Sequence, residues 1–335
     1  MDLSSLKLNV ALRLMRQTLP IILVRLGANL LFWIAAIIYL VVVGGVAWLL
    51  GQAVPALGTI LFLVAIGALA PIYHLAYRYV FYMLKAAHIA AMSELLSNNK
   101  LPDQTTQLAW GKARVQERFG EMNMMFVIDE LVTAVIRAFT STVFNIARWL
   151  PGDTIATLAR IANRVIYFAM NYIDEAILAR SFWVERDSVW QNARDGVVLY
   201  AMIWKSILMN AVALMIISYV PFVISVIVFA APVGLLMSVF SSQLAGWSIV
   251  ATFILAWLIK VAIGDSFAMA AIIATYHHET ATLTPDPNMT AKLEQLSDKF
   301  RNLKQRAEGE FMQRTPQFAN NASANTTPVG NAADA

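Results

Sequence analysis

Two long stretches of the chain contain no Asp, Glu, Lys or Arg. They cover residues 26–77 and 206–259, which are 52 and 54 residues long. A helix that crosses a bilayer needs about 20 mostly apolar residues, so each stretch has room for two crossings and a turn. The pattern predicts an all-α integral membrane protein, built as a multi-pass transmembrane helical bundle.

The first stretch divides into two spans, at residues 30–50 and 57–79, around a turn that contains Pro55. In the second stretch, residues 206–240 contain Pro221 and Pro232 and form either one long kinked helix or a tight hairpin. A further span follows at residues 247–263. We favour two crossings here and four in total, because all 25 Lys and Arg lie outside the predicted outer turns. The positive-inside rule then places both termini and the middle segment in the cytoplasm.

The middle segment is charged, but its apolar residues recur at helical spacing. Residues 122–149 predict a long amphipathic helix with Glu130, Thr133 and Arg137 on one stripe. A second helix is predicted from Asp153 or Thr154 to residue 182, and a third begins near residue 187 or 188. These helices are too polar to face lipid on all sides, so they either lie in the membrane as interfacial or re-entrant helices or pack inside the bundle with the polar stripe facing water.

These patterns divide the chain into six consecutive segments. They are a basic interfacial N-terminal helix (1–27), a transmembrane hairpin (28–82), an amphipathic membrane-associated segment (83–205), a second transmembrane hairpin (206–276), a cytoplasmic tail with one amphipathic helix at 288–308 (277–314) and a disordered end (315–335). The tail helix carries a short coiled-coil-like face that either docks on a partner or folds back.

Composition narrows the function classes. Only 14% of the residues are charged, against about 25% in a typical soluble domain. There is no cysteine, which excludes disulfides and thiolate chemistry. No phosphate loop, dinucleotide fingerprint, nucleophile elbow or zinc helix is present. We therefore expect no enzyme activity, no catalytic residue, no cofactor, no metal and no nucleic-acid partner.

Several short runs resemble a known group of proteins. They are YIDEAIL at 172–178, VWQNARDGVVLY at 189–200, GDSFAMA at 264–270 and TPDP at 284–287. Over roughly residues 155–300 the chain resembles a group of uncharacterised bacterial multi-pass proteins, and more distantly the C-terminal half of choline-transporter-like proteins. The resemblance implies a bacterial inner-membrane protein. It implies no activity, and no choline-binding residue corresponds position by position.

A repeated acidic motif supplies the main candidate site. The tripeptide Ile-Asp-Glu occurs at residues 128–130 and 173–175, each time followed by apolar residues and an arginine. These groups either line a cation route or form structural salt bridges across the bundle. The candidate polar path comprises Glu130, Arg137, Asp174, Glu175, Arg180, Lys260 and Asp265. For Lys260 and Asp265 the favoured interpretation is a snorkelling lysine and an interfacial aspartate, and the alternative is an intramembrane ion pair.

Histidines supply the remaining candidates. His74 and Arg78 lie one turn apart near the inner end of the second span, where they contact either a substrate or lipid head groups. His277 and His278 are adjacent, so they point to different helix faces, and we interpret them as part of a helix C-terminus rather than as metal ligands.

The sequence leaves three function classes open. The favoured one is a transporter or channel for a small solute or ion, with the polar stripes of the middle helices facing a shared water-filled cavity. The alternatives are a non-catalytic membrane scaffold and an assembly factor that acts through the tail. Expected partners are membrane lipids and either a second copy of the chain or another membrane protein. The expected location is the bacterial inner membrane.

Overall fold

The computed structural model describes residues 7–102, 105–120, 122–145, 153–184, 188–240 and 246–309. All regular structure in these ranges is helical, which confirms the predicted all-α class. Four helical segments are long and apolar enough to cross a membrane. They are residues Leu19–Ala53, Pro55–Asn98, Val189–Val239 and Ser248–Thr280. The protein is thus a multi-pass membrane protein, and the predicted number of four spans agrees.

The helices follow one another with short connections. In chain order they are α1 (Leu8–Gln17), α2 (Leu19–Ala53), α3 (Pro55–Ala76), the π-helical turn η2 (Tyr77–Phe81), α4 (Tyr82–Asn98), α5 (Gln107–Phe119), α6 (Met122–Asn145), α7 (Asp153–Trp183), α8 (Val189–Ser218), α9 (Val220–Phe240), α11 (Ser248–Ile259), the π-helical turn η4 (Lys260–Gly264), α12 (Asp265–Thr280), α13 (Pro287–Leu296) and a final helix over residues 298–309.

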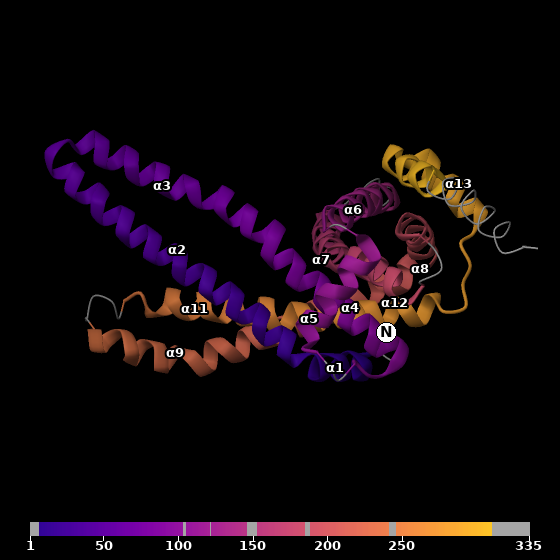
Figure 1. Ribbon diagram of the computed structural model, residues 1–335, viewed down its shortest axis with the longest axis horizontal. Coiled ribbons are helices and arrows are strands. Elements are labelled where there is room, and N and C mark those ends of the chain that lie inside the picture. Colours follow the sequence, from indigo (N-terminus) through magenta and orange to yellow (C-terminus); the bar gives the residue numbers. More distant parts are fainter. Residues whose placement is uncertain are drawn as a thin grey trace, which may run out of the picture.

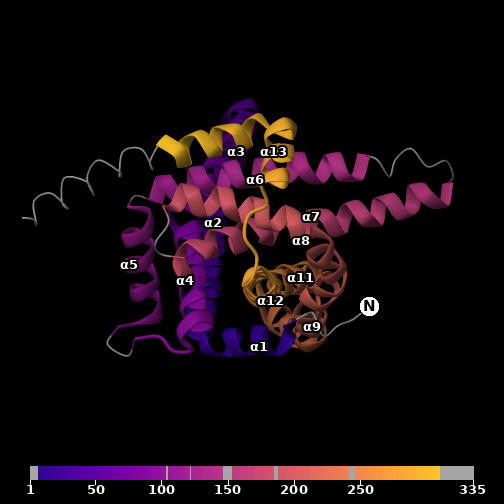
Figure 2. The same cartoon turned by 90° about the vertical axis from the view of Figure 1, so that its right-hand side faces the viewer.

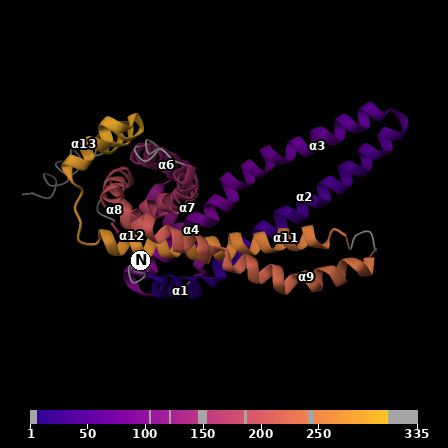
Figure 3. The same cartoon turned by 180° about the vertical axis from the view of Figure 1, so that it is seen from behind.

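Two apolar hairpins extend in the same general direction from a helical body (Figure 1). One consists of α2 and α3, and the other of α9 and α11; the view from behind shows that they diverge away from the body (Figure 3). Their large apolar side chains are mostly exposed, as lipid-facing chains are. The tip of the first hairpin is tight. A Cβ on Gly58 would lie 2.4 Å from the carbonyl oxygen of Ala47, so only glycine fits there.

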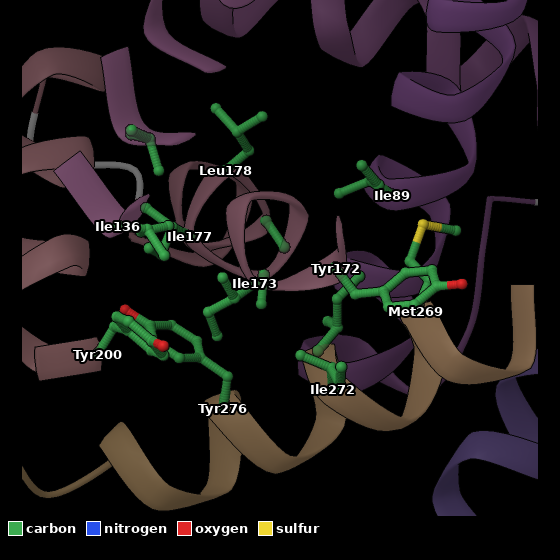
Figure 4. Close-up of a cluster of buried hydrophobic side chains, with 14 of the residues drawn as sticks. Ile89, Ile136, Tyr172, Ile173, Ile177, Leu178, Tyr200, Met269, Ile272 and Tyr276 are labelled. Atoms are coloured by element: carbon green, nitrogen blue, oxygen red, sulfur yellow. The ribbon is translucent and has the colours of Figure 1, made fainter. Parts of the chain in front are cut away.

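The body lies at one end of the hairpins. Helices α6 and α7 and the first part of α8 run across the hairpin direction, which Figure 1 views nearly end-on and Figure 2 side-on. Their buried side chains mesh with those of α4 and α12 in a continuous core. Figure 4 shows part of this core, with Ile173 and Ile177 of α7 between Ile136 of α6 and Ile272 of α12. The amphipathic segment is therefore a packed helical domain rather than a layer of separate helices.

Each hairpin continues into the body through a π-helical turn. The second predicted span does not end near residue 79, because η2 joins α3 directly to α4. The return helix of the second hairpin continues through η4 into α12 in the same way. At η4 the chain passes very close to the end of α8, since a Cβ on Gly264 would lie 2.1 Å from the carbonyl oxygen of Ser218. π-Helical segments such as η2 and η4 often occur at functional sites.

The ambiguous stretch 206–240 is one long interrupted helix. Helix α8 ends at Ser218, and α9 starts at Val220 with Pro221 in its first turn, where proline needs no hydrogen bond from its nitrogen. The alternative of a complete hairpin within these residues is wrong. The third middle helix is the beginning of this same span, because α8 starts at Val189 after the capping residue Ser188.

The tail folds back on the body instead of projecting from it. The prediction of one helix at 288–308 is wrong, because α13 ends at Leu296 and a second helix starts after Ser297, whose hydroxyl accepts from the backbone N–H of Phe300. Leu293, Phe300 and Leu303 have no exposed surface. Helix α13 packs against α6 and α8, as Figure 2 shows in part.

Candidate functional site

A cavity of about 830 Å³ lies where the first hairpin, the body and η4 meet. Its described lining residues are Arg25, Asn29, Tyr73, Tyr77, Phe81, Tyr82, Leu84, Lys85, Phe126, Asp129, Glu130, Thr133, Ala134, Arg137, Tyr167, Met170, Tyr172, Asp174, Glu175, Val261, Asp265 and Met269. None of them belongs to α8, α9 or α11, and none lies between residues 30 and 72. The cavity is therefore confined to the body end of the spans.

Helical spacing explains why two polar stripes face each other across this cavity. On α6, Glu130, Thr133 and Arg137 recur at three and four residues and share one face. On α7, Tyr167, Met170 and Asp174 do the same. The apolar sides of both helices are buried in the body core, so their polar sides turn towards the hairpin.

A buried ion pair joins α4 to α7 within the body. The Nζ of Lys85 on α4 donates to Oε1 of Glu175 on α7 at 2.7 Å. The Glu175 side chain is 4% exposed and that of Lys85 is 18% exposed. Burial, followed by the nearby charge of Asp174, raises the pKa of Glu175 well above its ordinary value.

Two more carboxylates lie beside this pair. Asp174 accepts hydrogen bonds on both oxygens, from the Thr133 hydroxyl at 3.0 Å and from the backbone N–H of Glu175 at 3.0 Å. Asp129 on α6 has an oxygen, Oδ1, that is buried and lacks a hydrogen-bond partner. Burial and the charge of Asp174 raise the pKa of Asp129 to about 7.

Asp265 anchors the opposite wall. Its Oδ1 accepts from the Nζ of Lys260 at 2.6 Å and from the hydroxyl of Tyr172 at 2.8 Å. The favoured interpretation of Lys260 as a snorkelling lysine is wrong, because only 8% of its side chain is exposed. The ring of Tyr219 lies 4.8 Å from its Nζ, and that of Trp257 lies 5.3 Å away. An ion pair with aromatic neighbours satisfies this lysine within the protein.

Arg25 of α2 connects three helices at the edge of the cavity. Its Nη1 lies 3.0 Å from Nδ1 of His88 on α4 and donates to the hydroxyl of Ser266 on α12 at 3.0 Å. The Nε2 of His88 lies 2.8 Å from the hydroxyl of Thr18, which itself donates to the carbonyl oxygen of Leu14. This chain is consistent if Nε2 of His88 carries the proton and Nδ1 accepts from Arg25.

The cavity has a buried floor and an exposed rim. Asp174 and Glu175 at the floor are buried, whereas Glu130, Arg137 and Tyr167 at the rim are exposed, Tyr167 at 66%. Seven of the described lining residues are aromatic: Tyr73, Tyr77, Phe81, Tyr82, Phe126, Tyr167 and Tyr172. Five are carboxylates and three are cationic, so the lining is acidic and aromatic.

The structure brings together five of the seven residues of the candidate polar path. They are Glu130, Arg137, Asp174, Glu175 and Asp265. Lys260 joins them only through its ion pair with Asp265. Within the described ranges, neither Glu130 nor Arg137 has an ion-pair partner, so the expected salt bridges between the acidic motifs and arginines across the bundle are not formed by these two residues.

Arg180 does not face this cavity, contrary to expectation. It donates to the side-chain oxygen of Asn192 on α8. Five residues separate Arg180 from Glu175, which is a rotation of about 140° around the helix, so the two side chains leave α7 on different faces.

The two candidates near the end of α3 also lie outside the cavity lining. His74 is exposed. The guanidinium of Arg78 stacks 4.9 Å from the ring centre of Phe126. His277 packs edge-on against Trp183, with ring centres 4.8 Å apart.

Sequence reasoning missed three charged residues of the cavity. Arg25 directly precedes the first uncharged stretch and falls in the segment predicted to be a basic interfacial helix. Lys85 follows that stretch by eight residues and had no assigned role. Asp129 belongs to the repeated Ile-Asp-Glu motif, which was the one signal that could have identified it.

Neither the search for a metal site nor the comparison with known proteins assigns a function to the cavity. Over the described ranges, no group of three or more His, Asp or Glu side chains is placed to hold a metal ion. No protein-family model matches the chain, and neither do curated proteins or solved structures. The resemblance to choline-transporter-like proteins stays a prediction.

Proposed function

We propose that the protein transports a small organic cation and that the acidic, aromatic cavity is its loading site. The observation that carries this proposal is the lining itself, in which five carboxylates and seven aromatic rings surround about 830 Å³. This volume is within the range of small-molecule sites, about 300–1,000 Å³.

The charge distribution favours a cationic ligand. Lys85 and Lys260 are already paired with Glu175 and Asp265. Arg25 is held by neutral partners on α4 and α12, and Arg137, the remaining cation of the described lining, is exposed at the rim. Aromatic faces attract ammonium groups by about 0.5–2 kcal/mol each, and such rings here outnumber the carboxylates. An organic ammonium ion uses both features, whereas a hydrated metal ion would use only the carboxylates.

The position of the cavity suits alternating access. Its wall combines α2 and η2 of the first hairpin with η4 of the second and α6 and α7 of the body. A change in the angle between a hairpin and the body would therefore reshape the site. The π-helical turns η2 and η4 lie at the two places where such a change must occur, and π-helical turns are less regular than α-helix.

The assembly-factor alternative has little apolar tail surface to act through. Of the apolar residues of the tail face, Leu293, Phe300 and Leu303 are fully buried against the body, and Leu296 is 40% exposed. A scaffold role remains the second function class, and the experiment below separates it from transport.

Uptake of radiolabelled alkylammonium ions into proteoliposomes tests the proposal. Ions of increasing size should be taken up in a saturable way, and radiolabelled alkylsulfonates should not be taken up. Asp174→Asn should weaken apparent cation affinity about tenfold, since it removes one charge at the floor. Glu117→Gln, which alters an exposed carboxylate outside the cavity, should leave the uptake unchanged. Uptake no larger than that of protein-free liposomes for every cation would favour the scaffold role.

A further inference from the structure

The floor of the cavity contains more negative than positive charge. Asp129, Asp174 and Glu175 converge there from α6 and α7, and among the described residues the one ion pair with any of them is that of Lys85 with Glu175. Burial of an uncompensated charge is costly, so such clusters usually hold a further positive charge.

Two oxygens at this floor identify where that charge is needed. Among the described residues, Oδ1 of Asp129 and Oε2 of Glu175 are both buried without a hydrogen-bond donor. The Glu175 residue as a whole is only 3% exposed. Asp174 differs from them, because both of its oxygens already accept hydrogen bonds. Protonation turns a carboxylate oxygen into a hydroxyl donor, so one proton shared by the two carboxyls would give both orphaned oxygens a partner.

None of the other described ionisable groups around the floor donates a hydrogen bond to Oδ1 of Asp129 or Oε2 of Glu175. They are Arg25 on α2, Tyr77 on η2, Tyr82 and Lys85 on α4, Glu130 and Arg137 on α6, Tyr172 on α7 and Asp265 on α12. Arg25 donates to Ser266 and contacts His88, while Tyr172 donates to Asp265. Helices α5, α8 and α13, which also pack on α6, contribute no described residue to the lining.

We propose that Asp129 and Glu175 together bind one exchangeable proton, and that an organic cation entering the cavity displaces it. The displaced proton passes to water at the exposed rim beside Glu130, and the positive charge of the cation replaces it. The net charge of the site is thus unchanged by the exchange. The proton site stands without the proposed function, and only the exchange rests on it.

The raised pKa values agree with this assignment. Burial keeps the pKa of Asp129 near 7 and that of Glu175 well above its usual range, although Lys85 opposes both shifts. The pair therefore changes its proton occupancy at pH values where cells operate.

Infrared difference spectroscopy of the protein in nanodiscs, without any added cation, tests the proton site. The wild type should show the C=O stretch of a carboxylic acid at about pH 5. This band should disappear by about pH 9, with a midpoint near pH 7. The Glu117→Gln control should retain this band, and the double variant Asp129→Asn/Glu175→Gln should lack it. Should the double variant fail to fold, Asp129→Asn alone should move the midpoint by at least about one pH unit. A wild type without a titrating carboxyl band, or a band unchanged by these substitutions, would overturn the proposal.

A second measurement tests the exchange. Methylammonium added to unbuffered wild-type protein near pH 6, where the site is almost fully protonated, should release about one proton per chain to a pH indicator, and the Asp129→Asn/Glu175→Gln variant should release none. Cation binding without proton release would overturn the exchange but not cation transport. A titrating band combined with no cation uptake by the wild type would instead overturn the proposed function and leave the proton site in place.

Discussion

Breaking the Lys85–Glu175 ion pair should destabilise the protein by an amount that depends on pH. Lys85→Met keeps most of the side-chain volume but leaves Glu175 without a donor on either oxygen, since Oε2 already has none. An ionised, unpaired Glu175 costs about 3–5 kcal/mol of unfolding free energy. A protonated Glu175 costs only about 1–2 kcal/mol, the value of a lost hydrogen bond. The loss should therefore grow as the pH rises above 4.5, because the carboxyl ionises in the unfolded chain there while burial raises the pKa of Glu175 in the folded protein.

A double-mutant cycle measures the pair directly. Lys85→Met, Glu175→Gln and the double variant should be unfolded reversibly in mixed detergent micelles at several pH values. We expect a coupling energy of about 2 kcal/mol or more at high pH. The control pair Arg114–Glu117 has the same 2.7 Å separation, but Glu117 is 67% exposed, so its coupling should stay below about 1 kcal/mol. Equal coupling in the two pairs would refute the reasoning that burial, and not distance, sets the strength.

Three further predictions use the same unfolding measurement. Gly264→Ala should cost about 1–3 kcal/mol, because the new Cβ would meet the carbonyl oxygen of Ser218 at 2.1 Å, whereas Gly67→Ala, which faces open space, should change stability by less than about 1 kcal/mol. Arg25→Met should cost about 2 kcal/mol or more, because the groups it bridges on α4 and α12 lose their donor. Asp129 has a folded-state pKa near 7 against an ordinary 3.8, so its proton stabilises the fold at low pH, and stability should fall by up to about 4 kcal/mol as the pH rises from about 4 to 7. Asp129→Asn should abolish that slope, and an unchanged slope would show that another group causes it.

The helical periodicity of the middle segment was informative because it depends only on local geometry. Glu130 and Arg137 are seven residues apart, which is almost two full turns, so they had to share a face. The packing of α6 against α7 then placed that face opposite Asp174. Arg180 failed the same test, because a five-residue spacing from Glu175 does not keep two side chains on one face.

Features that depend on tertiary contacts could not be predicted. Arg25 and Lys85 flank an apolar stretch, and such residues usually mark the membrane boundary, but here the body covers them and turns them into cavity groups. The π-helical turns η2 and η4 have no sequence signature that separates them from α-helix. The apolar residues keep a regular helical spacing across Ser297, and this spacing concealed the break between the two tail helices.

Cysteine chemistry at the cavity wall tests the central claim most directly, because the chain has no native cysteine. Ala134 lines the cavity between the two polar stripes, and Ala281 is exposed beyond α12. A cysteine at each position should be modified in separate proteins with a cationic and an anionic thiol reagent of similar size. We predict that Ala134→Cys reacts about tenfold faster with the cationic reagent, relative to the rate ratio at Ala281→Cys, and that Asp174→Asn reduces this preference. Equal ratios at the two positions, or a preference for the anionic reagent at Ala134→Cys, would contradict an accessible cavity that attracts cations.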